Sequence, residues 1–442
     1  MSQARSLAEW LAYAESVHPV GIDMGLARVG EVAARLGFAP PGHRPAPKSV
    51  IVAGTNGKGS TCLAIETLLL GAGLRVGTTL SPHVHRFNER VRVDGRELDD
   101  ATLCRAFAAV EAARDGVGLT YFEFSALVAL WCFRDAGVDV AVLEVGLGGR
   151  LDAFNLVSAD VAVVTSIGLD HQAHLGDDVE TIGREKAGVF RPGQRVVLGA
   201  DVSASVPAEA ARLGCEATRL GVDFHVEADA DTWVFRRGDR RLSGPRGPLA
   251  PANCALAVEA AAALTGLDGP ELVALGGVTF PGRLETWRLE ATPGAPRLLV
   301  DVAHNPAGAR FLADQIAQRG LGQRLVGVLG MLADKDAPGV AAALDDRVSD
   351  WICVPTRGAR GRRADALAAA IAPRPARVAA DLRTGLEMAL SSSAGRDGIL
   401  ALGSFDVVEQ VRDLLGAGFA GAVAETAATR AAARKAAREL PS

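Results

Sequence analysis

The most informative stretch of this chain is SVIVAGTNGKGS, which runs from Ser49 to Ser60. The segment Ser49–Ala53 is short and mostly apolar, which predicts a β-strand. Ser60–Leu70 is apolar over the length of a helix, so a glycine-rich turn joins the strand to the helix. The start of a helix offers free backbone N–H groups and a dipole that favours anions. This order of elements predicts a phosphate-binding loop.

The residues within the loop support this prediction. Gly54, Gly57 and Gly59 let backbone N–H groups approach an anion without interference from Cβ atoms, and Lys58 can reach the outer phosphates of a nucleotide. The spacing differs from the common GxxxxGK[ST] loop, because only two residues separate the first two glycines and a glycine follows the lysine. A plain strand-to-helix turn is the alternative interpretation. A lysine directly after the second glycine favours phosphate binding.

Short apolar strands alternate with helical stretches along most of the chain, which predicts parallel sheets covered by helices on both faces. We expect an α/β fold with a phosphate-loop, parallel-sheet domain over residues 1–283 and a smaller Rossmann-like α/β domain over residues 284–442. Residues 222–244 alternate in polarity and predict a small antiparallel sheet. The Ala/Arg-rich tail Ala422–Leu440 predicts either a helix or a frayed end. The expected strands are Ser49–Ala53, Val138–Glu144, Val161–Ser166, Val196–Leu198, Leu298–Val302, Arg324–Leu329, Trp351–Pro355 and Gly398–Leu402.

Composition argues against several classes of protein. The net charge of -5 argues against a general nucleic-acid or membrane-surface binder. No apolar run reaches the roughly 18–20 residues that span a bilayer, and the N-terminus lacks the apolar core of a secretory signal. The six cysteines are scattered without a CxxC pair, as is typical of reduced cytoplasmic proteins. We expect a cytoplasmic monomer without nucleic-acid or membrane partners.

Lysine is rare in this chain. Of 47 basic residues only five are lysines, so arginine is used wherever a generic positive charge suffices. A lysine that remains is then expected where a guanidinium cannot replace an amine. Lys58 lies in the phosphate loop, and Lys186 lies in a segment that has other signs of a functional site. The alternative for Lys186 is an ordinary lysine on an amphipathic helix.

Several further motifs, together with the loop, resemble the folate branch of the Mur ligase superfamily. The resemblance covers about residues 6 to 412 and is specific because the motifs follow in the family's order. Three positions depart from the pattern: the residues just before Asn253, Phe154 where threonine is common, and the segment Gly403–Asp406; these put fine substrate preference in doubt. The motifs are Ile22–Val29, GTNGKGS, Ser81-Pro82-His83 with Glu89-Arg90-Val91, Thr120–Glu123, Glu144–Ala153, Asp170-His171, Glu185–Gly188, Pro281–Arg283, Asp301–Pro306 and Asp334–Asp336.

The resemblance implies an ATP-dependent amide ligase. Such an enzyme joins L-glutamate to dihydropteroate, and to the γ-carboxylate of reduced folates, and releases ADP and phosphate. A carboxylate is a poor electrophile, so the chemistry requires activation as an acyl phosphate, a phosphate cradle, and positive charge around the developing anion. The implied cofactors are ATP, one or two Mg²⁺ ions, and K⁺ or another monovalent cation.

The resemblance also assigns site residues. Magnesium is expected at Ser81, Glu144 and His171, and at Lys186 if CO₂ carbamylates its amine. Glu144 ends an apolar strand and His171 follows another, where ligands of open α/β sheets usually bind. Catalytic roles are expected for Lys58, Lys186, His171, Arg283 and His304. ATP is expected to contact Gly54, Thr55, Asn56, Gly57, Lys58, Gly59, Ser60, Asn253, Arg283 and Asp301.

The pterin-bearing substrate is implied to bind three segments. Phe122 offers a flat apolar face for a pterin ring, although such a phenylalanine is by itself more typical of a core. Asp152 can accept hydrogen bonds from the ring's N–H groups. The implied residues are Asp23, Met24, Gly25, Leu26, Thr120, Tyr121, Phe122, Glu123, Leu151, Asp152 and Ala153.

Alternatives to this function remain at the level of sequence. The chain is expected to catalyse both glutamate additions, but an enzyme with only one of the two activities fits the same motifs. A cell-wall Mur ligase would share the chemistry. The folate-type motifs argue against it, as do the roughly 50 residues before the loop, too few for a separate UDP-binding domain. A non-catalytic nucleotide-binding module would leave Glu144, His171 and Lys186 without a purpose.

Overall fold

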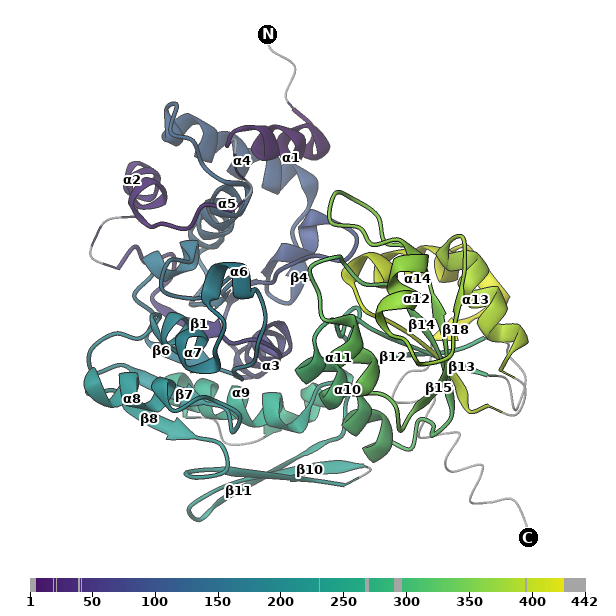
Figure 1. Cartoon of the computed structure of the whole chain (residues 1–442). Helices are drawn as coiled ribbons and strands as arrows, with labels where there is room; N and C mark the ends of the chain where they lie inside the picture. Colours follow the sequence, from purple (N-terminus) through teal and green to yellow (C-terminus); the bar gives the residue numbers. More distant parts are fainter. Residues whose placement is uncertain are drawn as a thin grey trace. The chain divides into compact units, whose positions relative to one another are not determined.

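The computed structural model describes residues 5–424 except 19, 21, 39, 41, 230, 267–269, 290–295 and 394–395. Its described residues form two compact units (Figure 1). Unit 1 comprises the residues up to 228 together with 232–245 and 250–278, and unit 2 comprises 229–231, 246–249 and the residues from 279 onward. The main division thus falls a few residues before the expected boundary at residue 283, and two short segments of unit 2 precede it in the sequence.

Unit 1 is built on an eight-stranded sheet with the order β4-β3-β2-β5-β1-β6-β7-β8. The six strands from β2 to β8 in this order are parallel, and β3 and β4 add an antiparallel edge. The α/β fold with a parallel sheet is therefore confirmed. The strands are β1 (Lys48–Ala53), β2 (Val76–Thr79), β3 (Val91–Val93), β4 (Arg96–Glu97), β5 (Val140–Glu144), β6 (Val161–Val164), β7 (Arg195–Leu198) and β8 (Glu216–Arg219).

Helices cover both faces of this sheet, which is why its central strands β1, β5 and β6 are mostly apolar and buried. Ile51 and Ala53 of β1 belong to one core together with Phe124 of α5. Helices α3 and α9 also pack on the sheet, and they contact each other. Among the described residues no helix is long and apolar enough to cross a bilayer. The helices are α1 (Leu7–Ser16), α2 (Ala27–Arg35), α3 (Lys58–Gly71), α4 (Asp100–Arg114), α5 (Tyr121–Ala136), α6 (Gln172–Leu175), α7 (Val179–Ala187), α8 (Ser205–Arg212) and α9 (Pro251–Thr265), with short 3₁₀ helices η1 (Phe87–Arg90), η2 (Ala153–Leu156) and η3 (Pro270–Gly277).

A separate three-stranded antiparallel sheet confirms the expectation for residues 222–244. It has the order β11-β10-β9, with β9 (His225–Ala228), β10 (Thr232–Arg237) and β11 (Arg240–Pro245). Trp233 and Phe235 alternate with exposed residues and are buried. The indole N–H of Trp233 donates to the carbonyl of Pro245 at 3.1 Å, so its polar edge is satisfied.

Unit 2 is a second, smaller α/β unit with a seven-stranded sheet of order β16-β15-β14-β17-β13-β12-β18. Five strands are parallel, and β12 runs antiparallel to both β13 and β18. Val423–Ala424 form strand β18 rather than the start of a helix, and the rest of the Ala/Arg-rich tail lies outside the described residues. The elements are β12 (Glu285–Arg288), β13 (Arg297–Asp301), α10 (Pro306–Gln318), β14 (Leu325–Leu329), α11 (Ala337–Ala342), β15 (Val348–Cys353), α12 (Ala364–Ala370), β16 (Ala376–Val378), α13 (Leu382–Ser391), β17 (Gly398–Leu402), α14 (Phe405–Gly416), η4 (Phe419–Gly421) and β18 (Val423–Ala424).

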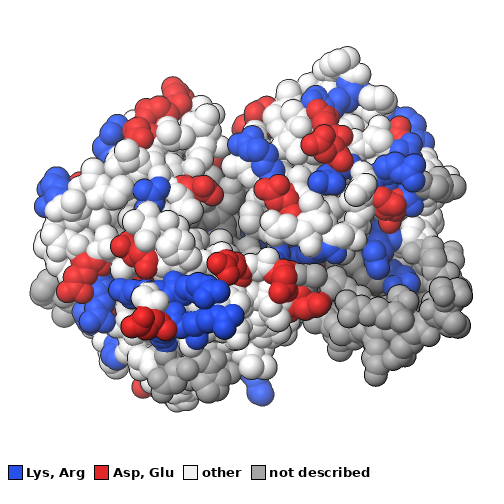
Figure 2. All heavy atoms as spheres, turned by 90° about the horizontal axis from the view of Figure 1, so that it is seen from below, with Lys and Arg blue, Asp and Glu red and all other residues white. Residues whose placement is uncertain are grey.

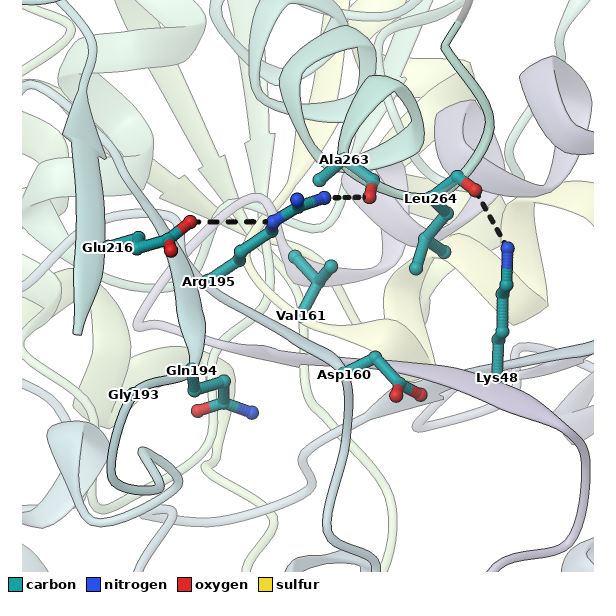
Figure 3. Close-up of a pocket in the computed structure, with 9 residues that line it drawn as sticks. All are labelled: Lys48, Asp160, Val161, Gly193, Gln194, Arg195, Glu216, Ala263 and Leu264. Carbon is teal, nitrogen blue, oxygen red and sulfur yellow. Dashed lines mark hydrogen bonds and ion pairs between the residues drawn. The ribbon is translucent and has the colours of Figure 1, made fainter.

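Two cations cap the carboxyl end of α9 at the amino ends of the unit 1 strands (Figure 3). The ammonium of Lys48 donates to the carbonyl of Leu264 at 2.8 Å, and the guanidinium of Arg195 donates to the carbonyl of Ala263. A pocket of about 340 Å³ lies beside them, lined by the first residues of β1, β7 and β8 and by Val161 of β6. Since the phosphate loop follows the carboxyl end of β1, this pocket lies at the opposite edge of the sheet.

We predict that these cations stabilise unit 1. Lys48→Gln and Arg195→Gln should each lower the free energy of unfolding by about 0.3–1 kcal/mol, because each removes a positive charge from a helix carboxyl end. Equilibrium urea denaturation measures the effect. Arg236→Gln is the control, since Arg236 lies on strand β10 rather than at a helix end and pairs with Glu227. A double variant of Lys48 and Arg195 that unfolds at the same urea concentration as this control would contradict the prediction.

Candidate active site

The expected nucleotide and metal residues of unit 1 gather at one edge of its sheet. β1, β2, β5 and β6 are parallel and adjacent in the sheet, so their carboxyl ends meet at the same edge. β1 leads into Gly54, β2 leads into Ser81, and β5 ends at Glu144. This edge is where open α/β sheets bind ligands.

The phosphate loop is braced by the strand beside it. The amide of Thr55 donates to the carbonyl of Ser166 at 2.8 Å, and the hydroxyl of Thr165 donates to the carbonyl of Asn56 at 2.6 Å. Gly54 has a φ of +146°, and a Cβ there would lie only 1.9 Å from Oγ1 of Thr165. The loop therefore requires glycine at this position. The sequence predicted no role for Thr165 and Ser166. The one feature that could have indicated it is their place at the end of an apolar strand.

Two lysines converge on the carbonyl oxygen of Gly54. The Nζ of Lys58 donates to it at 3.1 Å, and the Nζ of Lys186 donates to it at 3.0 Å. Helix α3 begins at Lys58, two residues earlier than expected, so the Lys58 backbone belongs to the first helical turn. The structure thus brings Lys186 of α7 to the phosphate loop, although 127 residues lie between the two lysines in the sequence.

Burial sets the charge state of Lys186. Desolvation lowers the pKa of its amine to about 7, and the nearby positive charge of Lys58 acts in the same direction. Asp170 and Asp152 oppose the shift. A substantial neutral fraction of the amine is therefore present near pH 7, and the neutral form is the one that reacts as a nucleophile.

Ser81 and Glu144 are neighbours. The amide of Ser81 donates to Oε2 of Glu144 at 2.7 Å, and the amide of Glu144 donates to the hydroxyl of Thr79 at 2.9 Å. Glu144 is buried. A hydroxyl and a carboxylate are the oxygen ligands that magnesium prefers, so these two residues fit the metal that the sequence implied. His171 lies beyond β6, at the start of α6, where it is exposed and has a left-handed backbone (φ +52°).

The loop after β5 holds the end of α7 in place. A Cβ on Gly149 would lie within about 3 Å of the backbone of Glu185 and Lys186, so the two segments are in close contact. The amide of Arg150 donates to the carbonyl of Glu185 at 2.8 Å. The side-chain amide of Asn155 donates to the carbonyls of Arg150 and Gly188 at 2.9 and 3.1 Å. These contacts fix the part of α7 from which Lys186 reaches the phosphate loop.

Asn253 lies against the phosphate loop. It belongs to the first turn of α9, and a Cβ on Gly57 would lie 2.8 Å from its Oδ1. Gly57 has a φ of +86°, which also favours glycine. The structure thus joins Asn253, expected to contact ATP, to the loop expected to hold the phosphates.

Two of the three expected acceptor segments are tied together by Arg28. Its Nε donates to Oε2 of Glu123 at 2.9 Å, and its Nη1 donates to Oδ2 of Asp23 at 2.5 Å. Thr120 and Glu123 also form a capping box at the start of α5. Met24, Gly25 and Leu26 lie between Asp23 and helix α2. Arg28 is part of the N-terminal motif, but the sequence predicted no role for it. The fold brings its two carboxylate partners together, so Arg28 links the two segments.

The third segment contains Leu151, Asp152 and Ala153. Both carboxylate oxygens of Asp152 accept backbone N–H groups: Oδ2 from Gly146 at 2.9 Å and Oδ1 from Phe154 at 2.9 Å. Burial raises the pKa of Asp152 to about 6 in spite of these bonds. Asp152 therefore holds its own loop, and a bond to a pterin ring would add to that role. Phe122 packs against Gly146 and makes an edge-to-face contact with Phe154 at 5.7 Å.

The expected site residues of unit 2, which are Arg283, Asp301 and His304, lie close together. The guanidinium of Arg283 lies over the rings of Phe280 and Phe405, at 5.3 and 5.5 Å from their centroids. Asp301 ends β13 and accepts the amides of Leu284 and Ala303 at 2.7 and 2.8 Å. Burial raises the pKa of the Asp301 carboxyl, and the positive charge of Arg283 opposes this. The ring of His304 lies 6.4 Å from that of Phe405.

The basic side chains of the hairpin β10–β11 are partly paired with acidic ones. Figure 2 shows basic and acidic side chains interspersed, with one cluster of basic ones. The hairpin β10–β11, at the bottom of the view in Figure 1, carries Arg236, Arg237, Arg240 and Arg241. Arg236 pairs with Glu227 at 3.3 Å and Arg237 pairs with the buried Glu259. Acidic partners thus offset part of the positive charge of this hairpin.

Comparison with known proteins agrees with this arrangement. Residues 282–405 match the family model of the Mur ligase glutamate ligase domain. The chain is 41% identical to the dihydrofolate synthase/folylpolyglutamate synthase of Escherichia coli K12, over 94% of this chain and 96% of that protein.

Two solved structures are similar over the same extent. E. coli FolC in complex with DHPP and ADP has a TM-score of 0.87 and 40% identity, with 94% of this chain and 99% of that chain covered. The bifunctional folylpolyglutamate synthase/dihydrofolate synthase of Yersinia pestis CO92, complexed with AMPPNP and a Mn ion, has a TM-score of 0.85 and 42% identity, with 94% and 100% covered. With this identity over nearly its whole length, the chain belongs to the dihydrofolate synthase/folylpolyglutamate synthase family of Mur ligases.

Proposed function

We propose that this chain uses ATP to ligate L-glutamate to dihydropteroate, which yields dihydrofolate, and to the γ-carboxylate of reduced folates, which lengthens their glutamate tail. The observation that carries the proposal is the convergence of Lys58 and Lys186 on Gly54, at the sheet edge where Ser81 meets Glu144. Membership of a family named for both synthases supports both activities.

The first chemical step is activation of the acceptor. A carboxylate oxygen of the acceptor attacks the γ-phosphorus of ATP, the bond from that phosphorus to the β,γ-bridging oxygen breaks, and ADP leaves. The loop from Gly54 to Ser60 holds the phosphates with backbone N–H groups and the start of α3, and Lys58 turns from Gly54 to the phosphates. In the second step the glutamate amine attacks the acyl carbon, phosphate leaves, and the nitrogen loses a proton.

Magnesium would be held by Ser81, Glu144, His171 and a carbamylated Lys186. When bound, the metal neutralises phosphate charge and polarises the transferred phosphoryl group. Formation of the carbamate needs a neutral amine, which the burial of Lys186 provides. Carbamylation turns a cation into a carboxylate-like oxygen ligand, so arginine at this position cannot replace lysine.

The remaining expected residues complete the proposal. Asn253, Arg283 and Asp301 contact the nucleotide, and Arg283 and His304 stabilise charge on the transferred phosphoryl group. The pterin moiety binds the segments that contain Asp23, Phe122 and Asp152. We also propose that the enzyme is a cytoplasmic monomer and that a monovalent cation such as K⁺ supports activity; size-exclusion chromatography with light scattering, and assays in K⁺ or tetramethylammonium buffers, test the latter two points.

We predict that Lys186→Arg abolishes most ligase activity although it preserves the charge. The turnover number should fall by about 100-fold or more, because a guanidinium neither fits the space beside Gly54 nor forms a carbamate. ADP release with dihydropteroate and glutamate measures the effect. Lys48→Arg is the matched control, since Lys48 lies at the opposite edge of the sheet, and it should retain near-normal turnover. Near-normal turnover of Lys186→Arg would remove the carbamate from the proposal.

We further predict that two acceptors each support glutamate-dependent ADP release. Purified enzyme should release ADP with dihydropteroate and, in a separate reaction, with tetrahydrofolate, and radiolabelled glutamate should enter both products. Activity with one acceptor alone would limit the proposal to a single synthase. Equal ADP release with and without either acceptor would contradict the proposed function.

A further inference from the structure

Arg90 lies at the same sheet edge as the phosphate loop, but no role has been given to it so far. It ends the 3₁₀ helix η1 and directly precedes β3. Its carbonyl accepts the amide of Leu80 at 3.1 Å, and the next residue, Val91, pairs with Thr79 of β2. Arg90 is therefore directly across from the residue that precedes Ser81.

The Arg90 side chain is held by neutral and aromatic groups. Its Nε donates to Nδ1 of His83 at 2.7 Å. Its guanidinium carbon lies 5.5 Å from the ring centroid of Tyr121 and 5.9 Å from that of Phe87. Burial lowers the pKa of the Arg90 guanidinium, and the negative charge of Glu144 is among the influences that oppose this shift. The guanidinium is thus fixed in place at its Nε end, and the residue is half-buried.

The negative charges of Glu144 and Glu89 influence this guanidinium, but among the described residues neither they nor any other carboxylate forms an ion pair with it. Within the described part of the chain Arg90 forms no ion pair, and its two terminal nitrogens donate no hydrogen bond to a protein acceptor. The adjacent Glu89 is already used, because its carboxylate accepts the amides of Val84 at 2.7 Å and His85 at 2.8 Å. Arg92, two residues along the same segment, shows the usual solution: it pairs with Glu66 at 3.2 Å.

A half-buried guanidinium whose terminal N–H groups have no acceptor among the described residues is free to bind an anion, so its place beside the site indicates an anionic ligand. The planar fork of a guanidinium matches the two oxygens of a carboxylate or phosphoryl group. Tyr121, which the guanidinium faces, belongs to the segment expected to bind the acceptor. Lys58 and Arg283 are already assigned to the phosphates of ATP, whereas no cation has been assigned to the reacting carboxylate of the acceptor.

We propose that Arg90 is a catalytic residue that binds the acceptor carboxylate through its terminal N–H groups and stabilises the oxyanion as the acyl phosphate forms and is attacked. The inference rests on the proposed function. Arg90 transfers no proton: it donates hydrogen bonds to oxygen while the bond from the γ-phosphorus to ADP breaks, and again while phosphate leaves the acyl carbon. Its contribution is the charge that the oxygen develops in each step.

Arg90→Ala and Arg90→Lys test this assignment. Arg90→Ala should lower kcat/KM for dihydropteroate by about 100-fold or more, with KM for ATP changed by no more than about 3-fold. Added guanidinium ion should restore part of the activity of Arg90→Ala, which a purely structural role would not allow. Arg90→Lys keeps the charge without the planar guanidinium, so its kcat/KM should lie between those of the wild type and Arg90→Ala. Arg86→Ala is the matched control, because Arg86 is on the same loop, exposed and paired with Glu97.

Several outcomes would overturn the inference. Equal kcat/KM values for Arg90→Ala and Arg86→Ala would show that Arg90 binds no reacting group. A weaker affinity for AMPPNP with an unchanged KM for dihydropteroate would assign the anion to the nucleotide instead. If Arg90→Ala fails to bind AMPPNP, Arg90→Lys decides, with retained AMPPNP binding and reduced acceptor turnover expected. Wild-type enzyme without acceptor-dependent ADP release would contradict the proposed function itself, separately from Arg90.

Discussion

The carbonyl oxygen of Gly54 accepts hydrogen bonds from both Lys58 and Lys186. This arrangement depends on the contacts that position the phosphate loop and the end of α7. Burial disfavours the charged form of Lys186, and the nearby ammonium of Lys58 adds repulsion. The pKa of Lys186 falls to about 7 as a result. An amine that is partly neutral beside a phosphate cradle is chemically different from an ordinary surface lysine.

This geometry depends on close backbone packing around the loop. Gly54 can approach Thr165 only because it lacks a Cβ, and Thr165 and Ser166, directly after β6, then form hydrogen bonds with Asn56 and Thr55. On the other side, the loop after β5 grips the end of α7 through Asn155 and the backbone of Arg150. Lys186 is therefore positioned by hydrogen bonds to a segment that begins directly after Glu144.

Arginines organise the surroundings of this edge in two ways. Arg28 joins Asp23 to Glu123 and so links the N-terminal segment to the start of α5. Among the residues that the structure describes, Arg90 forms no such ion pair; His83 and two aromatic rings contact its side chain. An arginine paired with carboxylates stabilises a structure, whereas an arginine whose terminal N–H groups remain available can bind an anionic substrate. The contrast explains why two arginines in neighbouring motifs have different expected functions.

The sequence by itself determined the alternation of strands and helices, the parallel sheet of unit 1, the antiparallel segment 222–244, and the phosphate loop. These features depend on local periodicity and on glycines at fixed spacing, which are visible in one dimension. It did not reveal the antiparallel strand β12, the strand β18, or the start of α3 at Lys58, since strand partners and helix ends depend on distant residues. Only the tertiary structure decided that Thr165 and Ser166 hold the loop, that Lys186 reaches Gly54, and that Arg90 forms no ion pair with a described carboxylate. Each of these is a relation between residues far apart in the chain or between side chains in space, and such relations exist only after the strands have taken their order in the sheet.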